Sequence, residues 1–114
     1  MKVEDLDVFK LSHKLTLRIY ELTGKFPSGE KFGLVSQMRR SATSIPTNIM
    51  EGAYRVGRKE FKHFISIAKG SCGETRYQLL LSKDLNYINA EKYFGLQAEY
   101  ERVSMMLTKL YQSL

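Results

Sequence analysis

The chain has 114 residues, of which 43% are hydrophobic and 26% are charged, and 18 Lys and Arg outnumber 12 Asp and Glu. This length suits one domain with one hydrophobic core, and the two prolines and the lack of low-complexity runs argue against a disordered chain. The net charge of +6 favours a polyanionic partner, with nucleic acid ahead of an anionic surface, although such a charge also serves solubility alone.

The charge is unevenly distributed along the sequence. The stretch 31–62 carries seven basic and two acidic residues, and so holds five of the six net positive charges. Residues 1–30 balance five basic against five acidic residues, and residues 63–114 carry six against five. The stretch 31–62 is therefore the first place to look for an anion-binding surface.

Cysteine content and hydropathy exclude several classes of protein. Cys72 is the single cysteine, so it cannot form an internal disulfide, and no C-x-x-C pair suggests a zinc or redox site. The N-terminal sequence MKVEDLDVFK is acidic and lacks the apolar run of a signal peptide. No stretch approaches the ~18 apolar residues of a membrane span. We expect a cytoplasmic protein with no membrane partner.

Apolar residues recur at steps of three and four in four segments, which is typical of amphipathic helices. The first predicted helix spans about residues 6–25, and Asp5 and Asp7 suit its N-cap and first turn. It should end near Gly24, ahead of the turn-forming residues 26–29. Its apolar face consists of Val8, Leu11, Leu15, Ile19, Leu22 and Phe26.

The second predicted helix spans about residues 30–54 and has Pro46 in its middle. Because proline lacks a backbone donor and crowds the carbonyl of Ala42, we expect a kink. The alternative is a first helix that ends near Ser44 and a second that begins at Pro46, but the apolar face continues across the proline and favours one kinked helix. That face consists of Leu34, Met38, Ala42, Ile45, Ile49 and Ala53. Side chains that could bond the freed carbonyls are Ser41, Thr43, Ser44, Thr47 and Asn48.

The third predicted helix spans about residues 58–85, after a plausible helix stop at Gly57. Its apolar face consists of Phe61, Phe64, Ile65, Ala68, Cys72, Thr75, Leu79 and Ser82. Gly70 and Gly73 lie in its middle, where each glycine costs about 1 kcal/mol relative to alanine. We therefore expect a neighbouring helix to approach closely there, and we interpret Cys72 as a small core residue.

The fourth predicted helix spans about residues 89–113, with Asn89 as its N-cap and Glu91 in its first turn. Its apolar residues alternate steps of three and four without interruption, which is the heptad pattern of left-handed helix packing. They are Tyr93, Leu96, Tyr100, Val103, Leu107, Leu110 and Leu114.

Four helices joined by short loops predict an all-α, single-domain protein over residues 1–114, folded as an antiparallel up-down-up-down four-helix bundle with its second helix kinked at Pro46. Several large residues fall outside the apolar faces: Phe9, Tyr20, Met50, Tyr54, Tyr77, Leu80, Leu81, Phe94 and Met106. One bundle interior cannot hide all of them, so we expect a second buried face and a homo-oligomer. The alternative is that they are the scattered apolar residues normal on any surface.

The strongest functional signal is the basic cluster within residues 31–62, which consists of Arg39, Arg40, Arg55, Arg58, Lys59 and Lys62. Arginine binds phosphate through two parallel hydrogen bonds, and Tyr54 could stack on a base. We expect these residues to contact RNA or DNA. A solvated basic face gives the same pattern, however, and Arg39 or Arg40 could form structural ion pairs instead. Glu51 and Glu60 could neutralise part of the cluster.

Signals for catalysis are weak. His13 and His63 lie in different predicted helices, and the sequence contains no H-E-x-x-H motif and no phosphate-binding glycine loop. Ser71 and Cys72 have no base nearby in the sequence. We expect no catalytic residue, no metal and no cofactor. Glu74 beside His63 in a cleft would favour an enzyme.

Several motifs together resemble the four-helix-bundle family of ribosomal RNA intervening-sequence proteins. They are D-L-D-V-F-K at 5–10, E-K-F-G-L at 30–34, S-Q-M-R-R-S-A at 36–42, S-I-P-T-N-I at 44–49, E-G at 51–52, R-K-E-F at 58–61, and I-A-K-G-S at 67–71 with Glu74. The resemblance covers nearly the whole chain in order. One departure is C-G-E-T-R at 72–76, where a Glu-Leu-like pair is expected after the small residues.

The resemblance implies a protein often encoded inside insertions in bacterial large-subunit ribosomal RNA genes, without established catalytic activity and with a poorly defined role. The family is similar to the accessory variability protein of diversity-generating retroelements. That protein forms a basic, five-membered barrel of bundles and associates with a reverse transcriptase and nucleic acid. A homopentamer with a basic surface is therefore implied. We expect a non-enzymatic oligomer that binds RNA or DNA non-specifically. The alternative is a protein-interaction scaffold, for example for a nucleic-acid-processing enzyme.

Overall fold

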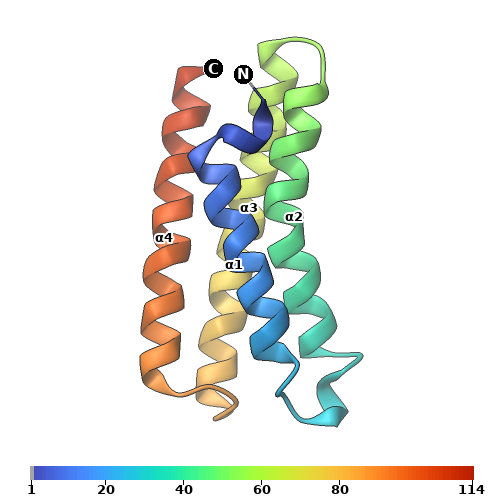
Figure 1. Ribbon diagram of the computed structural model, residues 1–114, viewed down its shortest axis with the longest axis vertical. Helices are drawn as coiled ribbons and strands as arrows, with labels where there is room; N and C mark the ends of the chain where they lie inside the picture. The colour runs from blue at the N-terminus through green and yellow to red at the C-terminus, as the bar shows by residue number, and fades with distance from the viewer. Residues whose placement is uncertain (1) are drawn as a thin grey trace.

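The computed structural model describes residues 2–114 and confirms the all-α bundle (Figure 1). Its helices are α1 (Asp7–Thr23), α2 (Leu34–Tyr54), α3 (Arg58–Asp84) and α4 (Ala90–Ser113), and short 3-10 turns cover Val3–Asp5 and Ser28–Glu30. Each helix packs against the next, and α1 also contacts α4, in a body of 43 × 25 × 20 Å. The α2–α3 turn lies at the same end of the bundle as the C-terminus (Figure 1).

Most residues of the predicted apolar faces are buried and form one core. Tyr100 is the largest of the fully buried side chains. The main buried members are Val8, Leu15, Ile19, Phe26, Leu34, Met38, Ala42, Ile45, Ile49, Ile65, Ala68, Cys72, Leu79, Leu96, Tyr100, Val103 and Leu107. The three-and-four spacing therefore identified the core correctly, because a helix places such positions on one face.

The helix starts differ from prediction at two places. The N-cap of α1 is Leu6 and makes no side-chain bond, so a capping role for Asp5 was wrong; Asp7 is the first residue of the helix, at its positive end. The second helix begins at Leu34 instead of about residue 30, because Gly33 has a non-helical backbone (ψ −109°). The cap of α4 was predicted correctly, since the Asn89 side chain accepts a hydrogen bond from the backbone of Lys92 at 2.8 Å.

Helix α2 continues without a break from Leu34 to Tyr54, with Pro46 buried inside it. The alternative of two helices separated near Ser44 was therefore wrong, while the kink stays a prediction. The carbonyl of Ala42, which loses its donor to the proline, accepts a hydrogen bond from the Thr16 hydroxyl of α1 at 3.2 Å. The compensating group thus comes from the neighbouring helix and not from the polar residues around the proline.

The expected close approach of a helix at Gly70 and Gly73 was wrong. A Cβ atom built on either glycine meets nothing within 4 Å. The close approach occurs instead at Gly52 near the end of α2, where a Cβ would lie 2.7 Å from the Cβ of Phe64 and 3.1 Å from the ring of Phe61. Gly52 therefore lets α2 and α3 come together next to the turn that joins them.

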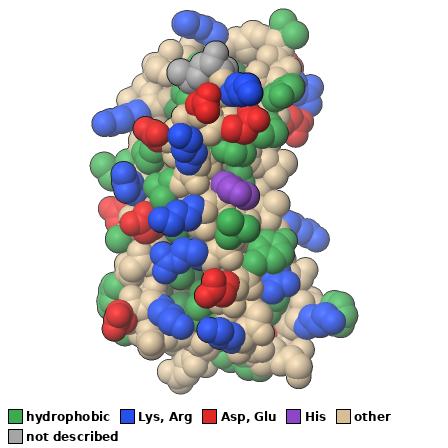
Figure 2. Space-filling view, in the orientation of Figure 1, with side chains coloured by type: hydrophobic (Ala, Val, Ile, Leu, Met, Phe, Trp, Pro, Cys, Tyr) green, Lys and Arg blue, Asp and Glu red, His purple; other side chains and the backbone are tan. Residues whose placement is uncertain are grey.

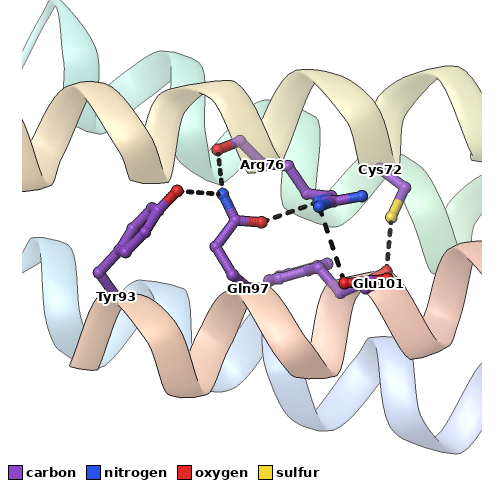
Figure 3. A network of polar contacts seen from close by, with 6 residues as sticks. Cys72, Arg76, Tyr93, Gln97 and Glu101 are labelled. Carbon is purple, nitrogen blue, oxygen red and sulfur yellow. Dashed lines mark hydrogen bonds and ion pairs between the residues drawn. The ribbon is translucent and has the colours of Figure 1, made fainter. Parts of the chain in front are cut away.

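A polar network holds α3 against α4 (Figure 3). The Nε atom of Arg76 donates to the side-chain oxygen of Gln97 at 2.8 Å, and the amide of Gln97 donates to the carbonyl of Arg76 at 3.0 Å. The same amide lies 3.0 Å from the hydroxyl of Tyr93. One turn away, the Cys72 thiol donates to the carbonyl of Tyr100 at 3.1 Å. Arg76 therefore joins α3 to α4, unlike the exposed Lys and Arg residues.

Three of the large apolar residues outside the predicted faces remain strongly exposed: Tyr54 at 77%, Tyr77 at 62% and Phe94 at 64%. Tyr20 is exposed on α1, although the guanidinium of Arg39 lies over its ring. The others are half-buried: Phe9, Met50, Leu80, Leu81 and Met106. Of these, Phe9, Leu81 and Met106 pack against the core. A homo-oligomer that covers the exposed residues stays a prediction.

Candidate nucleic-acid interface

The turn between α2 and α3 presents the most exposed part of the basic cluster. Arg55 leaves α2 with an extended backbone, and Gly57 then takes a positive φ of 98°, a conformation that glycine adopts at little cost. The chain re-enters a helix at Arg58, so Arg58 and Lys59 occupy the first turn of α3, where both side chains are exposed. Both lie at the end of the bundle that carries the α2–α3 turn (Figure 1).

The start of α3 has unusual electrostatics. Its N-cap, Gly57, has no side chain, and no side chain caps the free N–H groups of the first turn. The positive end of the helix dipole favours acidic residues, and Glu60 occupies the first turn of α3, but the two residues before it are Arg58 and Lys59. Free N–H groups, a helix N-terminus and two cations together attract an anion such as phosphate.

Two other members of the cluster are partly engaged within the chain. Arg55 forms an ion pair with Glu51 at 2.8 Å, and this hydrogen bond raises the pKa of the guanidinium. Arg55 also lies 5.0 Å over the ring of Phe64. Lys62 is half-buried, with its ammonium 4.6 Å over the ring of Tyr111. The expected neutralisation by Glu51 therefore occurs at Arg55, and Arg58 and Lys59 are the better-exposed cations.

The ring of Tyr54 stands beside this turn and is accessible. Tyr54 is 77% exposed, and the neighbouring Val56 is 92% exposed. An exposed ring next to several cations can stack on a base while the cations contact phosphate. The predicted stacking residue is thus sterically free to bind.

Arg39 and Arg40 have different environments although they are adjacent. The guanidinium of Arg39 donates to the hydroxyl of Thr23 at 3.0 Å and to the carbonyl of Tyr20 at 3.2 Å, and lies 4.6 Å over the Tyr20 ring. These groups are at the C-terminal end of α1, where the negative end of the helix dipole favours a cation, and the Tyr20 carbonyl also accepts from the backbone N–H of Gly24 at 3.1 Å. This geometry favours a structural role for Arg39, whereas Arg40 is exposed.

Arg40 lines a groove along the outer surface of α1 and α2. One part of it encloses about 650 Å³ and includes Phe32, Arg39 and Arg40. The other part encloses about 580 Å³ and includes Phe9, Pro46 and Met50. The two parts share Tyr20, Thr43 and Thr47, so they form one continuous surface with apolar and polar lining. Arg40 therefore lies apart from the α2–α3 turn, against a surface of mixed apolar and polar lining.

The other candidates for chemistry lie apart from each other. His13 and His63 are exposed on different helices, and His63 packs edge-on against the ring of Phe64. Glu74 follows His63 by eleven residues on α3, which is about 16 Å along the helix axis. Ser71 is hydrogen-bonded to Ser44 at 2.8 Å. Within residues 2–114, no group of three or more His, Cys, Asp and Glu side chains could hold a metal ion, and no helix has the length and hydropathy to cross a membrane.

A further basic surface was not predicted from the sequence. Figure 2 shows a column of Lys and Arg side chains over α1 on the face seen in Figure 1. The α1 residues Lys10, Lys14 and Arg18 are exposed and four residues apart. Segment totals hid this row, because residues 1–30 are neutral overall. The signal was nevertheless present in the spacing, since residues four apart lie on one helix face.

The fold and its surface define a class of protein: an antiparallel four-helix bundle with exposed basic surfaces. The family model described as 23S rRNA-intervening sequence protein matches residues 4–109, and the chain belongs to this family. A similar solved structure is a protein of unknown function from the S23 ribosomal protein family of Bacteroides thetaiotaomicron VPI-5482. It has a TM-score of 0.82 and 27% sequence identity, and the match covers 91% of this chain and 97% of that chain. No match was found among curated proteins.

Proposed function

We propose that this protein is a non-enzymatic, cytoplasmic homo-oligomer that binds RNA or DNA with little sequence specificity through its basic surface. The observation that carries the proposal is the start of α3, where the exposed cations Arg58 and Lys59 flank uncapped backbone N–H groups. A phosphate placed there receives hydrogen bonds from the backbone and charge from both side chains. Arg55 and Lys62 extend this surface, and Arg40 adds a separate contact on α2.

Self-association is supported by the exposed apolar side chains on several helices, which include Tyr77 and Phe94. Five copies is the number that the resemblance to the retroelement accessory protein implies. A ring of subunits would repeat the α2–α3 turn several times, so weak contacts to one strand would add up. Light scattering of the purified protein, with and without RNA, measures the subunit number directly.

The test is a titration of fluorescent RNA and DNA by anisotropy at 50 and 200 mM salt. Because phosphate contacts release counterions, binding should weaken steeply at the higher salt and depend little on base sequence. Arg58→Gln with Lys59→Gln should weaken binding without loss of helicity. Arg39→Gln should lower thermal stability, since it uncouples α2 from the end of α1, and Arg40→Gln should leave stability unchanged. The absence of binding at both salt concentrations would refute the proposal.

The alternative is a scaffold that binds a protein, and the groove along α1 and α2 favours it. Its lining combines Phe9, Tyr20, Phe32 and Met50 with the exposed Arg40, and interface cores are enriched in aromatic residues, Met and Arg. An affinity capture treated with nuclease separates the two functions. A stable protein partner that survives nuclease and is lost with Met50→Asp would support the scaffold, whereas partners that all depend on nucleic acid would exclude it.

A further inference from the structure

The row of cations on α1 extends onto α4 and forms a second basic surface, here called the α1–α4 basic stripe. It consists of Lys10, Lys14, Arg18, Lys25 and Lys92, all of them exposed. Lys10 to Arg18 covers two turns of helix, about 12 Å along the axis. Lys25 follows the end of α1, and Lys92 is in the first turn of α4 beside it. The stripe therefore runs lengthwise along the bundle (Figure 2).

Two helices converge at one end of the stripe. Arg18, Lys25 and Lys92 line a shallow concavity of about 90 Å³, which has room for about three water molecules. Leu22 and Leu96 complete its apolar lining, and Glu21 is its single acidic residue. Three cations against one acid leave this concavity positive, although the surrounding segment is neutral in sum.

The cations of the stripe are not used for packing. Among residues 2–114, ion pairs within 4.0 Å involve Arg55, Arg76 and Lys83, and no member of the stripe takes part in one. Like charges four residues apart on a helix repel each other, so the row from Lys10 to Arg18 destabilises α1 on its own. Charged residues scattered over the surface would keep the protein soluble, so solubility does not explain why these cations lie on one helix face. An extended anion removes this repulsion, which gives the alignment a physical reason.

We propose that the α1–α4 basic stripe binds the sugar–phosphate backbone of a double-stranded nucleic acid that runs along the bundle axis. This inference rests on the proposed function and adds a contact surface separate from the α2–α3 turn, which lies at the end of the bundle opposite to Lys25 and Lys92 (Figure 1). A duplex carries one charge per about 1.7 Å of its axis, so a length of about 12 Å beside the row contains about seven phosphates on the two strands, of which those on the near side face the cations.

The composition of the stripe favours a duplex over a single strand. Proteins that hold single strands stack the bases on exposed aromatic rings, whereas a duplex offers only its backbone to a flat basic surface. The exposed rings on α1 are His13, which stacks on the ring of Phe9, and Tyr20, which has the guanidinium of Arg39 over it. Both line the groove between α1 and α2 and lie outside the stripe. The stripe thus offers charge without a stacking surface, and it should discriminate little between sequences.

The experiment compares two triple variants that remove the same charge. The stripe variant carries Lys10→Gln, Lys14→Gln and Arg18→Gln. The control variant carries glutamine at three other exposed lysines: Lys31, Lys69 and Lys109. Circular dichroism confirms that both fold. Anisotropy then follows 20-bp RNA duplexes of two sequences and a 20-nucleotide single strand at four salt concentrations.

We expect the stripe variant to bind both duplexes at least tenfold more weakly at 100 mM salt, with the slope of log K against log salt lowered by about 2 to 3. The control should change affinity by less than about threefold, and the single strand should respond less than the duplexes to the loss of the stripe. If the unmodified protein binds but the stripe variant matches the control, this inference is wrong and the proposed function stands. If the single strand is affected more, the duplex assignment is wrong. If the unmodified protein binds neither, both proposals fail.

Discussion

Replacement of Gly52 by alanine tests the packing of α2 against α3 directly. The new Cβ would lie 2.7 Å from the Cβ of Phe64 and 3.3 Å from the carbonyl oxygen of Phe61. Neither atom is the end of a flexible side chain, so α3 itself must shift, and the cost is at the upper end of overpacking, about 3 kcal/mol. Alanine returns about 1 kcal/mol of helix propensity. The net loss of about 2 kcal/mol lowers the melting temperature by about 8 °C for a chain of this size.

Gly70→Ala and Gly73→Ala are matched controls within α3. Both positions are helical, and a Cβ at either meets nothing within 4 Å. Each should gain about 0.5 to 1 kcal/mol, or about 2 to 4 °C, because only the propensity term remains. Thermal unfolding followed at 222 nm measures all three variants. If Gly52→Ala were as stable as the unmodified protein, the predicted clash would be wrong. A loss of stability at Gly70 would place another chain against α3.

Two further predictions concern the buried groups between α3 and α4. The hydroxyl of Tyr100 is buried and makes no hydrogen bond within residues 2–114, so Tyr100→Phe should raise the free energy of unfolding in urea by about 1 kcal/mol; a loss of that size would reveal a partner for the hydroxyl. Burial raises the pKa of the Cys72 thiol to about 11, so the folded chain keeps a proton that the unfolded chain loses above about pH 9, and stability should fall between pH 9 and 11. The thiol should account for up to about 3 kcal/mol of this loss in the free energy of unfolding, so the stability of Cys72→Ala should depend less steeply on pH in that range. Equal pH dependence in the variant and the unmodified protein would contradict the raised pKa.

The bundle could be predicted from the sequence because its information is local and repeated. Each apolar face follows from residues three and four apart, and short loops leave antiparallel packing as the simple solution. The cap of α4 was equally local, since Asn89 and its bonding partner are three residues apart. These features need no knowledge of which helix lies beside which.

Features that depend on the neighbouring helix could not be predicted in this way. The carbonyl freed by Pro46 is bonded by Thr16, which is 30 positions earlier in the chain. Gly52 and Gly70 look alike in the sequence, but only Gly52 faces a neighbouring helix at close range. The basic stripe was missed for another reason, because totals over segments average out a row such as Lys10 and Lys14 that occupies one face.

The adjacent arginines show why family motifs cannot assign roles by themselves. Arg39 and Arg40 stand together in the S-Q-M-R-R-S-A motif, yet successive residues point about 100° apart on a helix, so they cannot both face α1. Arg39 reaches the carbonyl of Tyr20 in the last turn of α1, where it adds a side-chain hydrogen bond to the one that this carbonyl accepts from the backbone N–H of Gly24. The planar guanidinium of Arg39 donates hydrogen bonds at the end of a helix here, and the same donors could bind a phosphate. Retention of either arginine in the motif is therefore compatible with folding or with binding, and only stability and affinity measured on the same variant separate the two.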